Sequence, residues 1–187
     1  MKANLKAQQR IESKQRILNV ASRLFKKNGY SATGIDQIMN EAGLTAGAFY
    51  AHFKSKQDLF EHCLEYSLQQ SRTLLFQGTE NLHGDELINQ IMSRYVSSLH
   101  RDLVERGCIL PSIAAEIHRE SKKTNALIAK YLEAWVQMIA DNLRGVDDAS
   151  LRRQKAVHMV SAAVGSILLS RMTKGFTISD ELLQAPT

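Results

Sequence analysis

The sequence is poor in residues that interrupt or cross-link a fold. It has two prolines and ten glycines among 187 residues, so long regular elements are expected. Its two cysteines, Cys63 and Cys108, form no CxxC pair and are too few for a disulfide framework, which favours a reducing, cytoplasmic setting. No apolar run approaches the roughly 18 residues that a membrane span needs, and the basic start lacks the apolar stretch of a signal peptide. A membrane protein is therefore not expected.

Positive charge is concentrated in the first third of the chain. Residues 1–60 contain ten Lys and Arg against four Asp and Glu, whereas residues 61–187 contain fourteen against fifteen. The net charge of +5 thus originates in the first segment. This distribution favours a polyanionic partner such as nucleic acid. Charge alone leaves open the alternative of a solvated basic helix face that has no partner.

Apolar residues recur at helical spacing along nearly the whole chain. No strand-like alternation, internal repeat or low-complexity segment interrupts the pattern. The sequence therefore predicts an all-α fold. Beyond the first helices, the pattern predicts helical segments over about 55–77, 87–99, 109–119, 121–144 and 150–173.

The basic segment predicts three helices. The first runs from about residue 9 to Asn28. Lys2 and Lys6, which precede this helix, and Arg10 at its start are candidates for a flexible arm that reaches DNA. Thr33 and Thr45 each precede an apolar pattern, as N-caps of two short helices do. Gly43 lies in the turn between these helices, where it can adopt a positive φ. Two short helices joined by such a turn are typical of a helix-turn-helix.

A longer motif surrounds this turn, in the segment GYSATGIDQIMNEAGLTAGAFYAHFKSKQDL from Gly29 to Leu59. It combines a Gly-aromatic entry, a Thr-capped helix, an Ala-Gly-Leu-Thr turn, a Tyr-x-His-Phe close and a Ser-Lys start of the next helix. The segment closely resembles the DNA-binding signature of the tetracycline-repressor (TetR) family of bacterial transcription regulators. The resemblance implies an N-terminal three-helix helix-turn-helix domain, residues 1–55, and a helical regulatory domain for ligand binding and dimerisation, residues 56–187.

The resemblance also implies which residues touch operator DNA: Thr33, Thr45, Ala46, Gly47, Tyr50, His52 and Lys56. Small side chains at the start of the third helix let the backbone approach the major groove. That helix lacks Arg, Asn and Gln for bidentate base readout, so phosphate contacts and DNA shape are expected to supply much of the affinity. One residue departs from the family pattern, because Gly34 stands where Ser or Thr usually offers a hydroxyl to a phosphate.

For the remaining two-thirds, the resemblance implies a homodimer formed through about 121–144 and 150–173, and a pocket for a small-molecule inducer. Candidate pocket residues, each of which could equally be plain core, are Phe76, Met92, Tyr95, Cys108, Ile113, Ile117 and Trp135. Cys108 follows Arg106 and Gly107 in a run that resembles a Gly-Cys segment of some family members, which sense electrophiles through that thiol. Arg106 would favour the thiolate, and a buried, inert cysteine is the alternative.

The motifs of the sequence bear on three possible functions. The resemblance favours a repressor that a ligand releases from its operator, cytoplasmic and associated with the bacterial nucleoid when bound. A helix-turn-helix protein that organises DNA without a ligand would lack a pocket and show little sequence preference. An enzyme is not expected, since the sequence has no nucleophile–base pair, phosphate loop or paired carboxylates, and Glu116 with His118 is too slight a signal. No cofactor is predicted, and the histidines show no metal-ligand spacing.

Overall fold

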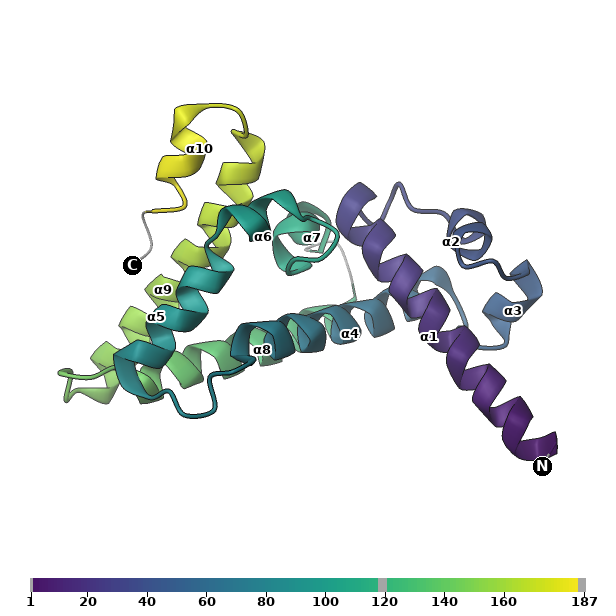
Figure 1. Cartoon of the computed structure of the whole chain (residues 1–187), viewed down its shortest axis with the longest axis horizontal. Helices are drawn as coiled ribbons and strands as arrows, with labels where there is room; N and C mark the ends of the chain where they lie inside the picture. The colour runs from purple at the N-terminus through teal and green to yellow at the C-terminus, as the bar shows by residue number, and fades with distance from the viewer. Residues whose placement is uncertain (1, 118–120, 185–187) are drawn as a thin grey trace.

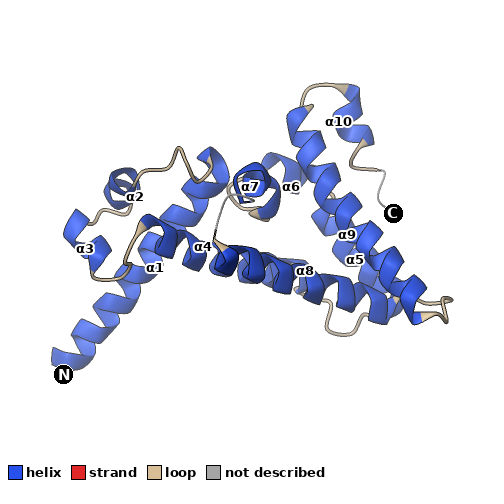
Figure 2. Ribbon diagram, turned by 180° about the vertical axis from the view of Figure 1, so that it is seen from behind, coloured by secondary structure: helices blue, strands red, loops and turns tan. Residues whose placement is uncertain are grey.

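The computed structural model describes residues 2–117 and 121–184, and every regular element in this part of the chain is an α-helix (Figures 1 and 2). The prediction of an all-α fold is confirmed. Three helices form the N-terminal unit: α1 (Lys2–Asn28), α2 (Ile35–Glu41) and α3 (Ala46–Tyr50). The others are α4 (Lys56–Phe76), α5 (Gly84–Tyr95), α6 (Ser98–Asp102), α7 (Leu110–Ile117), α8 (Lys122–Asn142), α9 (Ala149–Met172) and α10 (Thr177–Glu181).

The helices are arranged in an elongated molecule whose termini lie at opposite ends (Figure 1). The three N-terminal helices gather at one end. Helix α4 begins there, packs against α1 and runs on beside α8, so it belongs to both parts of the molecule. Helices α8 and α9 pack against each other, and α5, α6, α7 and α10 pack around them. Within the described residues, no helix is long and apolar enough to cross a membrane.

The core of the N-terminal unit is built from the apolar faces that the sequence pattern predicts. Ile17, Ala21 and Phe25 of α1 are fully buried. The ring of Phe25 meets that of Phe60 edge-on, with 5.2 Å between centroids, and Phe60 comes from α4. Aromatic pairs in this geometry add stability beyond the area they bury. The first turns of α4 thus complete the core of the helix-turn-helix unit.

The turn between α2 and α3 is a Schellman motif, in which two backbone amides satisfy carbonyls at the end of a helix. The amide of Gly43 donates to the carbonyl of Asn40 at 3.1 Å, and that of Leu44 donates to Met39 at 3.0 Å. Gly43 has φ +63°, which confirms the positive φ predicted for it. Leu44 packs against the core from the turn. This geometry fixes the angle at which α3 leaves α2.

Two predictions about helix starts were wrong. Helix α1 begins at Lys2 rather than near residue 9, so the segment expected to be a flexible arm is helical. It contains no Gly or Pro and is rich in good helix formers. The N-cap of α2 is Gly34 rather than Thr33. The Thr33 hydroxyl instead donates to the carbonyl of Gly29 at 2.7 Å, which ties the loop back to the end of α1.

Candidate DNA interface and ligand cavities

The candidate recognition surface is the outer side of α3. Thr45, its N-cap residue, is exposed, as are Ala46 and Gly47 in its first turn. Tyr50 is 69% exposed, whereas the neighbouring Phe49 is fully buried. The short helix is therefore anchored by one aromatic side chain and presents another, beside a strip of small residues. This shape suits close approach to a DNA groove.

Thr33 does not belong to this surface. Its side chain is fully buried, and its hydroxyl is engaged with the Gly29 carbonyl. The predicted contact between Thr33 and DNA is therefore not supported by the structure. Family resemblance marked the position, but only the fold shows that the hydroxyl stabilises the α1–α2 loop.

His52 and Lys56 lie at the edges of the recognition surface. The Nε2 atom of His52 is 2.8 Å from the Ser13 hydroxyl on α1. The pKa of His52 is lowered, first by its partial burial and then by the positive charges of Arg10 and Lys14. The Lys56 ammonium lies 4.4 Å from the centroid of the Tyr30 ring, a cation–π contact at the start of α4.

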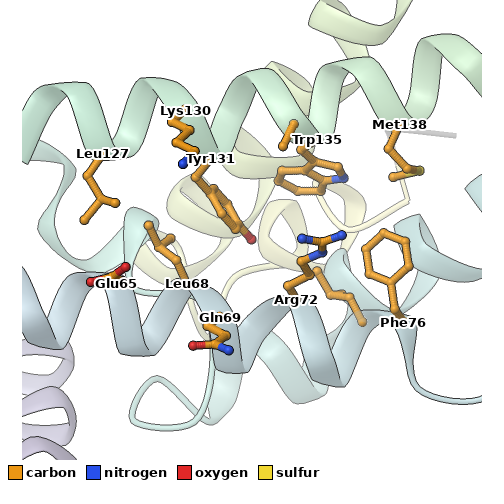
Figure 3. A pocket seen from close by; sticks show the side chains of 12 residues that line it. Glu65, Leu68, Gln69, Arg72, Phe76, Leu127, Lys130, Tyr131, Trp135 and Met138 are labelled. Atoms are coloured by element: carbon orange, nitrogen blue, oxygen red, sulfur yellow. The ribbon is translucent and has the colours of Figure 1, made fainter.

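One cavity of about 460 Å³ lies between α4 and α8 (Figure 3). Its walls are the aromatic side chains of Phe76, Tyr131 and Trp135. Arg72 and Lys130 place two positive charges at its sides, against one negative charge from Glu65. The indole Nε1 of Trp135 is buried and has no hydrogen-bond partner among the residues that the structure describes. A buried donor without a partner is costly, so a ligand acceptor at this position would be favoured.

A second cavity, of about 510 Å³, lies among α4, α5, α6 and the loop before α7. Tyr95, Arg106 and Cys108 line it. The ring centroids of Tyr95 and Trp135 are 4.8 Å apart, so this aromatic pair lies between the two cavities.

The predicted ligand residues are thus distributed over two sites. Phe76 and Trp135 line the first cavity, and Tyr95 and Cys108 line the second. Met92 and Ile113 are core residues, exposed by 2% and 0%, and line neither of these cavities. The side chain of Ile117 lies outside the described residues. Sequence reasoning missed Arg72, Lys130 and Tyr131. Arg72 lies four residues before Phe76 and Tyr131 lies four before Trp135, so each shares a helix face with a predicted residue, and Lys130 is next to Tyr131.

Cys108 has the properties of a buried thiol rather than of a reactive thiolate. It is 2% exposed, and burial raises its pKa. Burial likewise raises the pKa of Cys63 to about 12. The positive charge that acts on the Cys108 thiol is that of Lys26 rather than of Arg106, and it lowers the pKa less than burial raises it.

We therefore expect both cysteines to resist thiol reagents in the folded chain. Because the thiolate is the reactive form, labelling by 5,5′-dithiobis(2-nitrobenzoate) at pH 7.5 should be slower than in denaturant by about two orders of magnitude or more. Absorbance at the released thiolate band measures both rates. Rapid labelling of one cysteine in the folded wild type, lost in Cys108→Ser, would instead identify Cys108 as an accessible sensor.

A direct contact joins the regulatory helices to the helix-turn-helix unit. The carboxylate of Glu116 on α7 accepts hydrogen bonds from the Ser31 amide at 2.8 Å and the Ser31 hydroxyl at 2.9 Å. Glu105, in the loop before α7, pairs with Lys27 at 3.2 Å and with Arg23 at 3.6 Å on α1. Both acidic residues flank the segment that contributes Arg106 and Cys108 to the second cavity.

Comparison with known proteins agrees with this architecture. A family model described as bacterial regulatory proteins of the tetR family matches residues 17–63, and a model of the LmrA/YxaF-like transcriptional regulator C-terminal domain matches residues 85–178. The chain belongs to the TetR family. The family consists of helix-turn-helix transcriptional regulators and not of enzymes.

TetR-family relatives resemble different lengths of the chain. The uncharacterized regulator YerO of Bacillus subtilis is 31% identical over 146 residues, 70% of this chain and 50% of that protein. The chain thus spans half the length of YerO. The regulator LmrA of Bacillus subtilis is 28% identical over 172 residues, 89% of this chain and 90% of LmrA. A crystal structure from Saccharomonospora viridis, in complex with choline, has a TM-score of 0.74 at 21% identity over 92% of each chain, which shows a shared fold.

Proposed function

We propose that the chain is a homodimeric repressor that binds operator DNA through α3 and is released by a small-molecule ligand. The observation that carries the proposal is the exposed strip on the helix-turn-helix formed by Thr45, Ala46, Gly47 and Tyr50. The net positive charge of the chain lies in the same segment, residues 1–60. Residues 1–55 are the proposed DNA-binding domain, and residues 56–187 the regulatory domain. In the DNA-binding domain, phosphate contacts supply affinity, and the α3 surface fixes the position of the protein in the major groove.

The proposed dimer forms through α8 and α9. Helix α9 leaves Leu151, Leu169 and Met172 exposed by 43%, 46% and 74%. Small residues, Ala162 and Gly165, lie between them along the helix, and a Cβ built on Gly165 would meet no atom within 4 Å. Apolar and small side chains on one outer face allow a second copy to pack closely. The two α3 helices of a dimer would then meet successive major grooves about 34–36 Å apart.

The proposed ligand site is the cavity between α4 and α8. Its aromatic walls favour a ligand with a flat apolar body. Arg72 and Lys130 outnumber Glu65 and so favour a negative charge on the ligand. The unpartnered Trp135 indole offers a hydrogen bond. Choline is bound to the Saccharomonospora viridis structure, so that protein of the same fold holds a small molecule. The charges here favour an anion rather than that cation.

The proposed route from ligand to DNA runs through residues 105–116. A ligand that alters the packing around Tyr95 and Trp135 changes the position of this segment, which holds α1 through Glu105 and the α1–α2 loop through Glu116. Release requires only that the ligand binds the DNA-incompetent spacing more tightly. The same coupling makes DNA weaken ligand binding by an equal factor.

The chain carries its own reporter for this proposal, since Trp135 is its single tryptophan. We expect the aromatic sulfonate 8-anilinonaphthalene-1-sulfonate to bind saturably, quench Trp135 emission and weaken DNA binding. Arg72→Ala should lower its affinity about tenfold by removing a charge-assisted contact. The matched control is Arg106→Ala, which removes the same charge from the other cavity. Loss of binding in Arg106→Ala alone would place the ligand in the second cavity.

A further inference from the structure

The first half of α1 extends beyond the part of the chain that the family pattern covers. The TetR family model begins at residue 17, whereas α1 begins at Lys2. A helix of 27 residues is about 40 Å long. In Figures 1 and 2 its N-terminal half projects past α3, away from the regulatory helices. The N-terminal half of α1 therefore lies on the side of the helix-turn-helix unit where DNA is proposed to lie.

The character of one face of α1 changes along its length. Residues four apart lie on the same side of a helix. Ile17 and Ala21 of this face are fully buried against the other N-terminal helices. Toward the N-terminus the same face continues as Lys14, Arg10 and Lys6, of which Arg10 and Lys6 are exposed and Lys14 is half-buried. An apolar face thus becomes a basic one where the helix leaves the core.

The basic face adjoins the recognition helix. The Arg10 guanidinium donates to the carbonyl of Ala51, the C-cap residue of α3, at 3.2 Å. The Lys14 ammonium lies 5.7 Å from the centroid of the Phe53 ring, just after α3. Ser13 meets His52 between them. Arg10 and Lys14 are therefore held against the end of α3, and Lys6 continues the same face one turn further toward the N-terminus.

The three basic residues are also not neutralised by the protein. None of Lys6, Arg10 and Lys14 takes part in an ion pair among the described residues. The nearest acidic residue in sequence, Glu12, is exposed and accepts a hydrogen bond from Gln8. The lowered pKa of His52, to which Arg10 and Lys14 contribute, agrees with a positive potential at the end of α3.

We propose that Lys6, Arg10 and Lys14 form a second DNA-contacting surface, which binds backbone phosphates that flank the groove occupied by α3. This inference rests on the proposed function and names residues outside the segment that the family model matches. Phosphate contacts carry no sequence information, so this surface adds affinity, salt dependence and orientation but no base preference. Because α1 is one rigid helix, the phosphates that it reaches lie at a fixed distance from the bases that face α3.

The test is the salt dependence of binding to a random-sequence duplex between 50 and 200 mM KCl. Each phosphate contact contributes about −0.9 to the slope of log K against log salt concentration. The variant Lys6→Gln/Arg10→Gln/Lys14→Gln should reduce the slope by about 2–3 for each bound protomer. Its preference for a selected operator over random DNA should not change.

The control variant is Lys122→Gln/Arg144→Gln/Lys174→Gln, which removes three exposed positive charges from the regulatory domain. Equal slopes for both triple variants would overturn the proposal, because a general charge effect would then explain the data. Circular dichroism reveals whether the first triple variant is folded. If it is unfolded, the single change Lys6→Gln should still reduce the slope by about 0.9. An unchanged slope in Lys6→Gln would overturn the proposal. A wild type that binds no duplex would instead contradict the proposed function itself.

Discussion

A Gly47→Glu chain is expected to fold as the wild type does and to lose at least about 100-fold in affinity for duplex DNA, or roughly 2.7 kcal/mol. The nearest atom to a Cβ built on Gly47 is the Thr45 hydroxyl, 3.9 Å away, and the residue is exposed. A larger side chain therefore fits the free protein, and Glu favours a helix more than Gly does. On DNA, the same side chain would place a carboxylate in the groove among phosphates.

Fluorescence anisotropy on a labelled duplex measures this loss, with thermal unfolding as the check on folding. The charge-matched control is Asn89→Glu, on the exposed side of α5 and away from α3. It changes the net charge by the same amount and should leave affinity within a few-fold of the wild type. If both variants lose affinity equally, long-range charge rather than contact at α3 governs binding.

A Gly29→Ala chain is expected to be less stable by roughly 2 kcal/mol. Gly29 has φ +84°, a backbone conformation that residues other than Gly rarely adopt. A Cβ there would also lie 2.2 Å from the Oε1 atom of Glu116. The Glu116 carboxylate must then move, and its hydrogen bonds to Ser31 are lost. Denaturant unfolding of the variant and wild type gives the difference.

The contact between Glu116 and Ser31 is tested by a double-mutant cycle that combines Gly29→Ala with Glu116→Ala. In the wild-type background this change removes two hydrogen bonds to Ser31 and should destabilise the chain. In the Gly29→Ala background those bonds are already broken, so the same change should cost little or relieve the clash. A coupling energy above about 0.5 kcal/mol is expected. Additive effects would mean that α7 does not hold the α1–α2 loop through Glu116.

Local patterns in the sequence were sufficient for the helix-turn-helix. The turn at Gly43 follows from backbone chemistry, because the Schellman geometry needs a residue that accepts positive φ. The burial of Phe49 and Phe53 follows from helical spacing. Thr33 shows the limit of such reasoning. A Thr before a helix can cap it or bond back to the preceding turn, and the packing of the loop against α1 decides between the two.

Contacts between distant segments could not be predicted in the same way. Periodicity identifies the inner face of a helix but not the helix that it meets, so residues predicted to share one pocket line two cavities. Ser31 and Glu116 are 85 positions apart, and neither carries a local signal of their contact. The basic face of α1 was visible as Lys6 and Arg10, but its placement depends on a helix that begins earlier than expected.

The most direct test of the central claim is a selection of duplexes from a random pool by the purified wild-type chain, with Gly47→Glu selected in parallel. We expect the wild type to enrich one inverted-repeat sequence whose half-sites are centred a helical turn or a multiple of it apart. Gly47→Glu should enrich none. Failure of the wild type to enrich any sequence, or enrichment of the same sequence by Gly47→Glu, would contradict operator recognition by α3.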